Sequence, residues 1–527
     1  MKKNKRLTLV AVFALLLLAT MGTARAEKEW TIMVYCAADN DLAPFGLIDI
    51  NEMEMVGSTD DVNIIVQFDG SEEYSPEAVG SCRYYVTKDT DMQTIKSPVV
   101  ENLGEVDMGA KKTFVEFLEW GVTKYPAKKQ LVVLWNHGSG WYQSVDAMPL
   151  DFTSPKDVQD LIDAVEQIQG GGKAALSKYI ASKRVQHLLK RSTSVRPFQP
   201  AKSQSGIFGG NDKAIAFDHH ADGSTTALST TDVREAMAEV REKLMGGKRF
   251  TVVSFDACLM GMVEVMHELR TEARWGIGSA KTEPGDGWPY DKFLAPLVAN
   301  PQMDGKGLGV IIVDEYTKHY ARTNQMALNP FHKANCTQAI CDLDKVGALT
   351  DALGEFAEVI KNPALRELCW QAVINTQHCG EIARTEPTVL LQLTAHRDIV
   401  HFAEVMKAFI AQSDADESVK EAINVKADAV IAAHDDCVVH FKHLLGTPLL
   451  SVKDTHGLAV MIPFLKIEPN YVQLQFGQSN WTEFLKVFKA TPQEAQALVA
   501  IMTGEGKDDA EREEGEQQDR FENLYDE

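Results

Sequence analysis

The sequence predicts an α/β fold, in which a mostly parallel β-sheet is flanked by helices and followed by a helix-rich C-terminal region. In roughly the first 300 residues, continuous apolar strand segments alternate with amphipathic helical segments, a pattern typical of parallel strands buried on both faces. From about residue 301 the helical pattern dominates. The chain has 527 residues, of which 45% are hydrophobic and 24% charged. This length exceeds one compact core, so we expect two or more lobes.

The expected strands are short runs rich in apolar residues, and several end in a polar or glycine-rich loop. Helical periodicity and capping residues mark the segments between them. In chain order the strands are 30–37, 62–70, 81–89, 129–141, 213–220, 249–258 and 274–280, and the helices are 47–57, 112–126, 229–244 and 259–269. Beyond residue 300 we expect a short strand and a long helix within 336–360, helices within 399–434 and a β-hairpin at 447–464.

The first 26 residues have the pattern of an export signal peptide. A basic start is followed by an apolar stretch that ends at Ala24-Arg25-Ala26, which matches an A-x-A cleavage site. The apolar stretch is short for a membrane span, and an uncleaved anchor is the alternative interpretation. We therefore expect an exported protein, periplasmic or secreted, with no membrane span after signal removal.

Two further segments depart from the globular pattern. Residues from about 148 to 211 have few strand-forming runs and a dense series of basic residues, so we interpret them as an insertion. Residues 504–527 are strongly acidic and are expected to form a disordered tail. The predicted domains are therefore an α/β domain at 27–300, which carries the insertion, and a C-terminal α/β domain at 301–503.

The composition limits the classes of partner. The formal net charge is −22, and it becomes −27 once the five basic residues of the signal are removed. Such an acidic surface argues against nucleic acids and anionic membranes as partners and favours cationic substrates. Eight cysteines in a chain of this length are not a disulfide scaffold, and their spacing does not match a zinc site.

Two reactive side chains stand at the ends of predicted strands. Cys258 follows the strand RFTVVSFDA, and His137 lies in NHGSGW, the glycine-rich exit of an earlier strand. Ligands gather beyond the carboxyl ends of parallel strands, so the two side chains can meet at one sheet edge. A helix starting directly after Cys258 would stabilise its thiolate. On position alone, a buried core cysteine and a structural histidine remain the commoner alternatives.

Five segments of the chain resemble the clostripain family of caspase-like cysteine peptidases, whose clan also contains caspases, legumains and gingipains. They are WTIMVYCAADNDL, LVVLWNHGSGW, KAIAFD, VVSFDACLMGMVEV and TEPGDGWPY, and they occur in family order. The resemblance covers residues 28–147 and 211–300 well and much of 301–465 more loosely. It implies a caspase-like sheet and a thiol protease, a cysteine endopeptidase acting on proteins or peptides, and the signal pattern adds that it is exported.

The resemblance also implies roles for individual residues. Carried over by position, it makes His137 the catalytic histidine and Cys258 the nucleophile. The backbone N–H groups of Gly138 and Cys258 would then stabilise the oxyanion. Family members that this chain resembles cleave after arginine or lysine. Asp256 and Asp286 are the candidates for binding such a basic P1 side chain, with loop-binding and turn roles as the alternatives.

The resemblance implies that the protein is cut within the basic insertion during maturation. Clostripain-like enzymes are commonly cut between the histidine and cysteine segments, and the insertion lies in that interval. Lys190, Arg191 and Arg196 are the expected sites of self-cleavage, which would leave a light and a heavy chain associated. A solvated loop is the alternative interpretation.

The chemistry implied by the resemblance requires no cofactor, and no metal site is predicted. Clostripain itself uses calcium. The segment that starts at Asp218 fails the EF-hand pattern, however, because His220 and Ser229 occupy its third and twelfth positions. The polar run 39–41 is expected to form a turn. Calcium therefore stays possible, but no motif in the sequence supports it.

Two other functions compete with the peptidase. A caspase-like protein that has lost catalysis could serve as a binding or surface protein, but the retention of His137, Gly138 and Cys258 argues against this. A different hydrolase on a doubly wound sheet is disfavoured, because no G-x-S-x-G elbow, Walker A loop or dinucleotide fingerprint stands where strands end.

Overall fold

The computed structural model describes residues 27–141, 215–219, 225–326, 334–379, 395–445, 452–464, 467–491 and 494. The expected signal, the insertion with Lys190, Arg191 and Arg196, and the acidic tail lie outside these residues. The strands of the largest described sheet are β1 (Lys28–Ala38), β2 (Val62–Gly70), β3 (Gly80–Tyr85), β4 (Val99–Gly104), β5 (Ala127–Trp135), β8 (Phe250–Asp256), β9 (Ala273–Gly278), β10 (Cys336–Asp342) and β12 (Val438–Leu444).

These strands form one sheet in the order β12-β10-β9-β8-β5-β1-β2-β3-β4. The neighbours from β9 to β2 are parallel. The pairs toward both edges, β2–β3, β3–β4, β9–β10 and β10–β12, are antiparallel. The predicted mostly parallel sheet is thus confirmed, and β10 and β12 show that it continues beyond residue 300.

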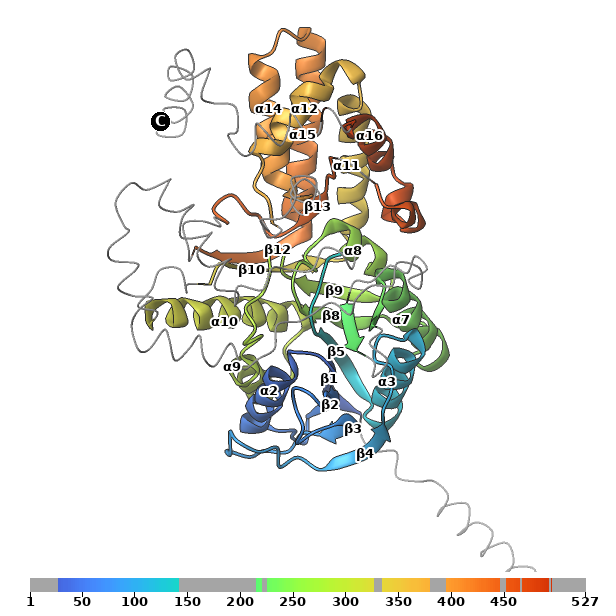
Figure 1. Ribbon diagram of the computed structural model, residues 1–527, viewed down its shortest axis with the longest axis vertical. Coiled ribbons are helices and arrows are strands. Elements are labelled where there is room, and N and C mark those ends of the chain that lie inside the picture. Colours follow the sequence, from blue (N-terminus) through green and yellow to red (C-terminus); the bar gives the residue numbers. More distant parts are fainter. Residues whose placement is uncertain are drawn as a thin grey trace, which may run out of the picture.

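Helices cover both faces of the sheet (Figure 1). Alternate residues of β1 enter two separate cores, Ile32 and Val34 on one face and Met33 and Tyr35 on the other, because successive side chains of a strand point to opposite sides. The first face packs against α2 (Ala43–Val56), α9 (Tyr290–Ala299) and α10 (Gly305–Met326), and the second against α3 (Lys111–Lys124), α7 (Thr230–Leu244) and α8 (Val263–Leu269).

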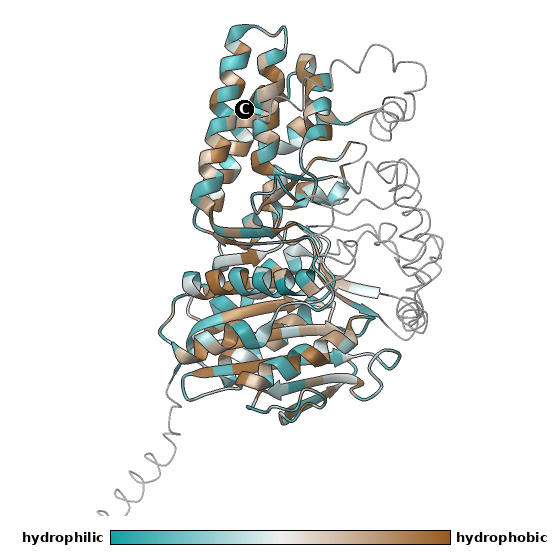
Figure 2. Cartoon of the chain, turned by 90° about the vertical axis from the view of Figure 1, so that its left-hand side faces the viewer, coloured by the Kyte–Doolittle hydropathy of each residue, from teal (hydrophilic) through white to brown (hydrophobic). Residues whose placement is uncertain are grey.

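The later helices gather at one end of the molecule, beyond β10 and β12 (Figure 1). The helices seen at this end carry both hydrophilic and hydrophobic residues (Figure 2), so an apolar side is available for packing. They are α11 (Val346–Ile360), α12 (Arg366–Asn375), α14 (Ile399–Gln412), α15 (Glu417–Cys437) and α16 (Asn480–Phe488), with short 3-10 helices at Pro363–Leu365, Pro469–Gln473 and Phe476–Gln478. This helix-rich region confirms the second part of the predicted fold class.

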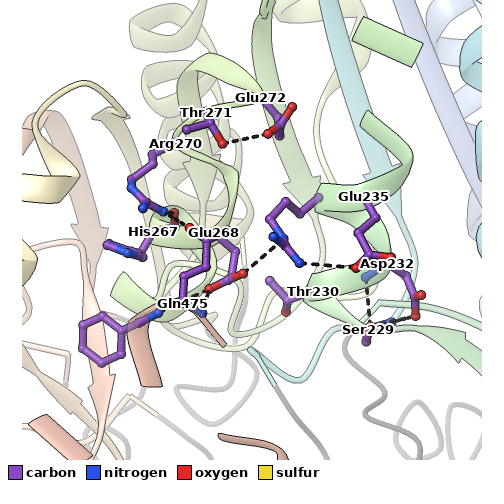
Figure 3. Close-up of polar contacts among 12 residues, drawn as sticks. Ser229, Thr230, Asp232, Glu235, His267, Glu268, Arg270, Thr271, Glu272 and Gln475 are labelled. Atoms are coloured by element: carbon purple, nitrogen blue, oxygen red, sulfur yellow. Dashed lines mark hydrogen bonds and ion pairs between the residues drawn. The ribbon is translucent and has the colours of Figure 1, made fainter. Parts of the chain in front are cut away.

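Polar contacts tie α7 and α8 to the C-terminal part of the chain (Figure 3). Arg234 Nε lies 3.3 Å from Glu268 Oε2, and the backbone N–H groups of Gln475 and Phe476 donate to Glu268 Oε1. Arg270 Nη1 donates to Gln475 Oε1 at 2.8 Å. The C-terminal region is therefore anchored on the helix that follows the Cys258 segment.

Two strands pair differently from the prediction. The segment expected as a further strand of the main sheet forms β6 (Ile215–His219), which pairs antiparallel with β7 (Thr225–Leu228) in a small sheet of its own. The expected hairpin at 447–464 contributes β13 (Ala459–Met461), which pairs with β11 (His396–Asp398), and residues 446–451 lie outside the described residues. Both segments have strand-like composition, but their partners are set by tertiary contacts.

Candidate active site

The candidate site lies at the carboxyl ends of two adjacent parallel strands. Trp135 of β5 and Asp256 of β8 are paired in register, and His137 and Cys258 each lie two residues further along their strands. The Asn136 backbone N–H still donates to the Asp256 carbonyl, at 3.3 Å. The parallel register thus brings the two predicted residues to the same edge of the sheet.

Gly138 brings the histidine loop against the nucleophile loop. A Cβ atom at this position would lie 2.3 Å from the Cys258 carbonyl oxygen and 3.0 Å from the Cys258 nitrogen. No real Cβ atom tolerates such distances, so only glycine allows the two backbones to come this close. The His-Gly pair is therefore required here by packing as well as by any role of its backbone N–H group.

The Cys258 segment is held by its neighbours rather than by a helix. Cys258 is half-buried, and its Sγ accepts a hydrogen bond from the Glu283 backbone N–H at 3.2 Å. Leu259 adopts a left-handed backbone conformation with φ of 63°, and its N–H donates to the Lys281 carbonyl. Gly261 bridges the exit of β9 and β13, because its N–H donates to Ser279 and its carbonyl accepts from Ala459.

The expectation of a helix beginning directly after Cys258 is wrong. The helix α8 begins at Val263, so its N-terminus is separated from Cys258 by a turn. A helix dipole therefore does not explain an activated thiolate here. The apolar run LMGM is compatible with a helix, but the left-handed Leu259 and the backbone contacts of Gly261 hold it in an irregular loop.

His137 has an acidic partner that the sequence did not single out for this role. Its Nε2 lies 2.8 Å from Oδ1 of Asp41, in the loop after β1, and both side chains are about one-third exposed. Burial raises the pKa of the Asp41 carboxyl, but the hydrogen bond and charge of His137, together with the charge of His219, outweigh it, so this pKa lies below its usual value. Asp41 thus orients the imidazole and leaves Nδ1 as the other nitrogen for chemistry.

Two asparagines fix the loops that carry Asp41 and His137. Asn136 Nδ2 donates to the carbonyls of Ala37 and Phe217, and Asn40 Nδ2 donates to the same two oxygens. Both side chains are buried. The ends of β1, β5 and β6 are therefore cross-linked directly behind the His137–Asp41 pair.

Asp256 lies in a group of carboxyls that we call the Asp256 group, which consists of the buried Asp49 and Asp256 and the partly buried Glu283. Asp256 Oδ2 accepts from the Trp288 backbone N–H at 3.2 Å and from the Tyr290 hydroxyl at 3.0 Å. Burial raises the pKa of Asp256 to about 7, although these donors and Glu283 oppose the shift. The group thus holds carboxyls close to their neutral form.

The other members of the Asp256 group also bind neutral donors. Asp49 Oδ2 accepts from Trp135 Nε1 at 2.7 Å. Glu283 accepts from Trp288 Nε1 at 3.1 Å and from Gln338 Nε2 at 3.0 Å. Burial, and next the charge of Asp256, raise the pKa of both carboxyls well above the usual range. The main influences on the pKa of these three carboxyls include no lysine or arginine.

The second candidate for substrate binding, Asp286, is exposed on the loop between β9 and α9. Its neighbour Gly287, with φ of 59°, covers the Asp256 group: a Cβ atom there would lie 3.2 Å from both Asp256 Oδ2 and Asp49 Oδ2. Asp286 therefore lies on the loop that covers the Asp256 group, whereas Asp256 ends β8 and belongs to the carboxyl group beneath that loop.

A comparison with known families identifies the class of protein. The profile of the clostripain family matches residues 34–170 and 203–446, which is more than half of the chain. The chain belongs to the clostripain family. It is accordingly a cysteine peptidase that acts on peptides, as its sequence motifs imply. No curated protein matches it.

Solved structures of clostripain-type proteases share the fold. A secreted C11 cysteine protease from Bacteroides thetaiotaomicron, in complex with an irreversible peptide inhibitor, is 16% identical with a TM-score of 0.54, over 86% of this chain and 99% of that one. An inactive zymogen C11 protease from Parabacteroides distasonis is 15% identical with a TM-score of 0.52, over 87% and 99%. At identities this low, the comparison shows a shared fold and nothing further.

The cysteines of this clostripain-family chain form no disulfide. All eight lie in the described residues, and six of them are buried. Cys258 and Cys82 are half-buried, and Cys82 lies on β3, far along the sheet from β8. Cys258 is thus the only half-buried cysteine at the carboxyl edge beside His137. No described helix is long and apolar enough to cross a membrane.

Proposed function

We propose that this clostripain-family peptidase is an exported cysteine endopeptidase that uses Cys258 and His137 to cleave after arginine or lysine, and that it cuts itself in the basic insertion. The observation that supports the proposal is the in-register pairing of Trp135 with Asp256, because His137 and Cys258 each follow two residues later at the same edge of the sheet. A cysteine adjacent to an oriented histidine is the arrangement that thiol nucleophiles require.

The reaction needs two steps and one histidine. The Cys258 thiolate attacks the scissile carbonyl, the C–N bond breaks, and protonated His137 gives its proton to the departing amine. Water, deprotonated by His137, then cleaves the thioester and releases a carboxylic acid and the thiol. The backbone N–H groups of Gly138 and Cys258 are the candidates for stabilising the tetrahedral oxyanion, and losing one such donor costs about 10²–10³ in rate.

Specificity for a basic P1 residue is supported by the Asp256 group. Its three carboxyls lie next to the nucleophile segment without a described cationic partner. A guanidinium or ammonium would supply that charge, and a charge-assisted hydrogen bond in a buried site selects strongly. Asp286, exposed on the covering loop, is the weaker candidate. Export is supported by the signal pattern in residues 1–26.

The central test compares three purified proteins on a peptide library read by mass spectrometry, under reducing conditions. Wild type is expected to cleave after arginine and lysine, and Cys258→Ala to lose about 10⁴-fold or more of this activity. Cys82→Ala is the matched control, because Cys82 is also half-buried but lies away from the site. Activity in Cys258→Ala, or cleavage mainly after uncharged residues, would refute the proposal.

Self-processing has a separate test on denaturing gels. Wild type is expected to give two bands and Cys258→Ala one band. A variant with Lys190→Gln, Arg191→Gln and Arg196→Gln is expected to stay intact while remaining able to cleave added peptide. Two bands from purified Cys258→Ala would show that another protease makes the cut.

A further inference from the structure

Two cysteines outside the candidate active site lie close together where the helix-rich region joins the sheet. Cys341 lies on β10, and Cys437 is the last residue of α15, which leads directly into β12. β10 and β12 are antiparallel neighbours (Figure 1), and Cys341 is paired in register with Val438, the residue that follows Cys437. The fold therefore brings the two cysteines together, although α11, α12, α14 and α15 lie between them in the sequence.

Both thiols enter the same core. Neither side chain is exposed to solvent, and both belong to the core on the side of α3 and α8. The Cys437 thiol donates to the Asp342 carbonyl at 3.8 Å, which places its sulfur beside the backbone of Cys341. A hydrogen bond between the two thiols, and next burial, raise the pKa of Cys341 well above its usual value. The two sulfurs are therefore in contact with each other.

This contact distinguishes the pair from other cysteines of the described chain. No second thiol is among the main influences on the pKa of Cys36, Cys82, Cys336, Cys369 or Cys379. A single buried cysteine packs as a small apolar side chain and needs no partner. Opposite residues of antiparallel strands have Cα atoms about 4.5–5.5 Å apart, and a disulfide spans about 4.4–6.8 Å. The register of β10 and β12 thus brings the two backbones close enough for a bond between these sulfurs.

We propose that Cys341 and Cys437 form a disulfide in the exported protein, which links β10 to the end of α15. The structure holds both as free thiols and so corresponds to the reduced state of the pair. The proposal rests on the proposed export, because exported compartments are oxidising. In the reaction each thiol loses its proton, one bond forms between the two sulfurs, and two electrons pass to a disulfide oxidant, which is reduced to two thiols.

Burial determines when the disulfide forms and how it responds to reductants. An oxidant does not reach the two thiols in the folded protein, and the raised pKa of Cys341 disfavours the thiolate that would attack it. The bond therefore forms during folding, before the core closes. The same burial shields the finished bond, whereas the half-buried Cys258 stays accessible. A mild reductant is thus expected to keep Cys258 as a thiol while the disulfide persists.

The test uses the full chain with Cys258→Ala, which removes self-cleavage and the reactive thiol. Free thiols are blocked in protein from the exported fraction of expressing cells, and in protein refolded with reduced and oxidised glutathione. Peptide mapping by mass spectrometry without reduction is expected to find Cys341 linked to Cys437 in most molecules of both samples. The link should survive dilute dithiothreitol in the folded protein and be lost in guanidinium.

The disulfide also has an expected effect on stability. It closes a long segment that contains four helices, and cross-links that close long loops restrict the unfolded chain most. Oxidised protein should therefore unfold roughly 3–5 °C above the same protein refolded in reductant. Calorimetric scans of the two samples measure this difference.

Two variants in the same background keep the test decisive. Cys437→Ala should lose both the linked peptide and the temperature difference between its oxidised and reduced forms. Cys369→Ala, buried in the same core, is the matched control and should keep both. A link between other cysteines, or exported protein in which Cys341 and Cys437 are free thiols, overturns the proposal. Absence of export would instead refute that part of the proposed function, and the refolded sample would then decide the pairing.

Discussion

The Asp256 group and a second set of carboxyls, here called the Asp69 group and made up of Asp39, Asp69, Glu105 and Asp218, lie on opposite faces of one sheet edge, and their hydrogen-bond partners differ. Asp256 pairs in register with Trp135, which belongs to the core on the side of α2, whereas Asp69 pairs with Ala37 in the core on the side of α3. In the first group each carboxyl accepts hydrogen bonds from neutral donors. In the second, both oxygens of Asp69 and one of Asp218 have none.

The two groups therefore differ in whether hydrogen-bond donors stabilise their buried carboxyls. Neutral donors hold the Asp256 carboxyl in place whether or not a cation is present, which suits a substrate side chain that arrives and leaves. The unpartnered oxygens of Asp69 and Asp218 have no such donors, so hydrogen bonds do not offset their burial. Asp41 lies between the two, because its loop begins at Asp39 while its carboxylate contacts His137.

Among substitutions that leave Cys258 and His137 in place, the largest effect is expected from Asp256→Asn. Asparagine keeps an oxygen for the Trp288 and Tyr290 donors but removes the charge, so the fold should persist. We expect kcat/KM for an arginine-P1 peptide to fall about 10²–10³-fold, because the guanidinium of the bound substrate would lose the carboxylate that pairs with it. Measured beside it, Asp286→Asn should change the rate less than about threefold, since exposed charges are screened. The reverse ranking would assign specificity to the outer loop.

The central sheet, and the shared edge at which His137 and Cys258 lie, could be predicted from the sequence, because buried parallel strands are continuous apolar runs and their carboxyl ends meet at one edge. The position of β6 could not, since a five-residue strand does not encode its partner. The start of α8 was missed because LMGM fits a helix, whereas Leu259 adopts a left-handed conformation and donates to Lys281 in the loop after β9. Asp69 was predicted only as a residue near the end of the strand 62–70.

Asp41 shows the same limit for the site. It stands in a polar turn, and its contact with His137 spans 96 positions in the sequence. A polar run at a strand exit was the only available signal, and it fits an ordinary turn equally well. Such a partner is visible only once the order of β1 and β5 in the sheet is known.

The second largest effect is expected from Asp41→Ala. Without the carboxylate, His137 loses the hydrogen bond that orients it, and misplaced catalytic groups cost up to about 10²-fold. We expect kcat/KM to fall about 10–100-fold, equally for peptides with arginine and with its neutral analogue citrulline at P1. Because Asp41 is about one-third exposed, the unfolding temperature should change little. A loss confined to the arginine peptide would instead place Asp41 in substrate binding.

The smallest effect concerns pH and tests the Asp256 group directly. The pKa of Asp256 is raised to about 7, so its carboxyl is mostly neutral at pH 6 and mostly ionised at pH 8. Arginine stays charged over this range. The ratio of kcat/KM for the arginine peptide to that for the citrulline peptide should therefore rise with pH, by about an order of magnitude between pH 6 and 8. The ratio cancels the ionisation of Cys258 and His137, which both peptides share. It should be flat in Asp256→Asn, and a flat ratio in wild type would mean that another carboxylate recognises the basic side chain.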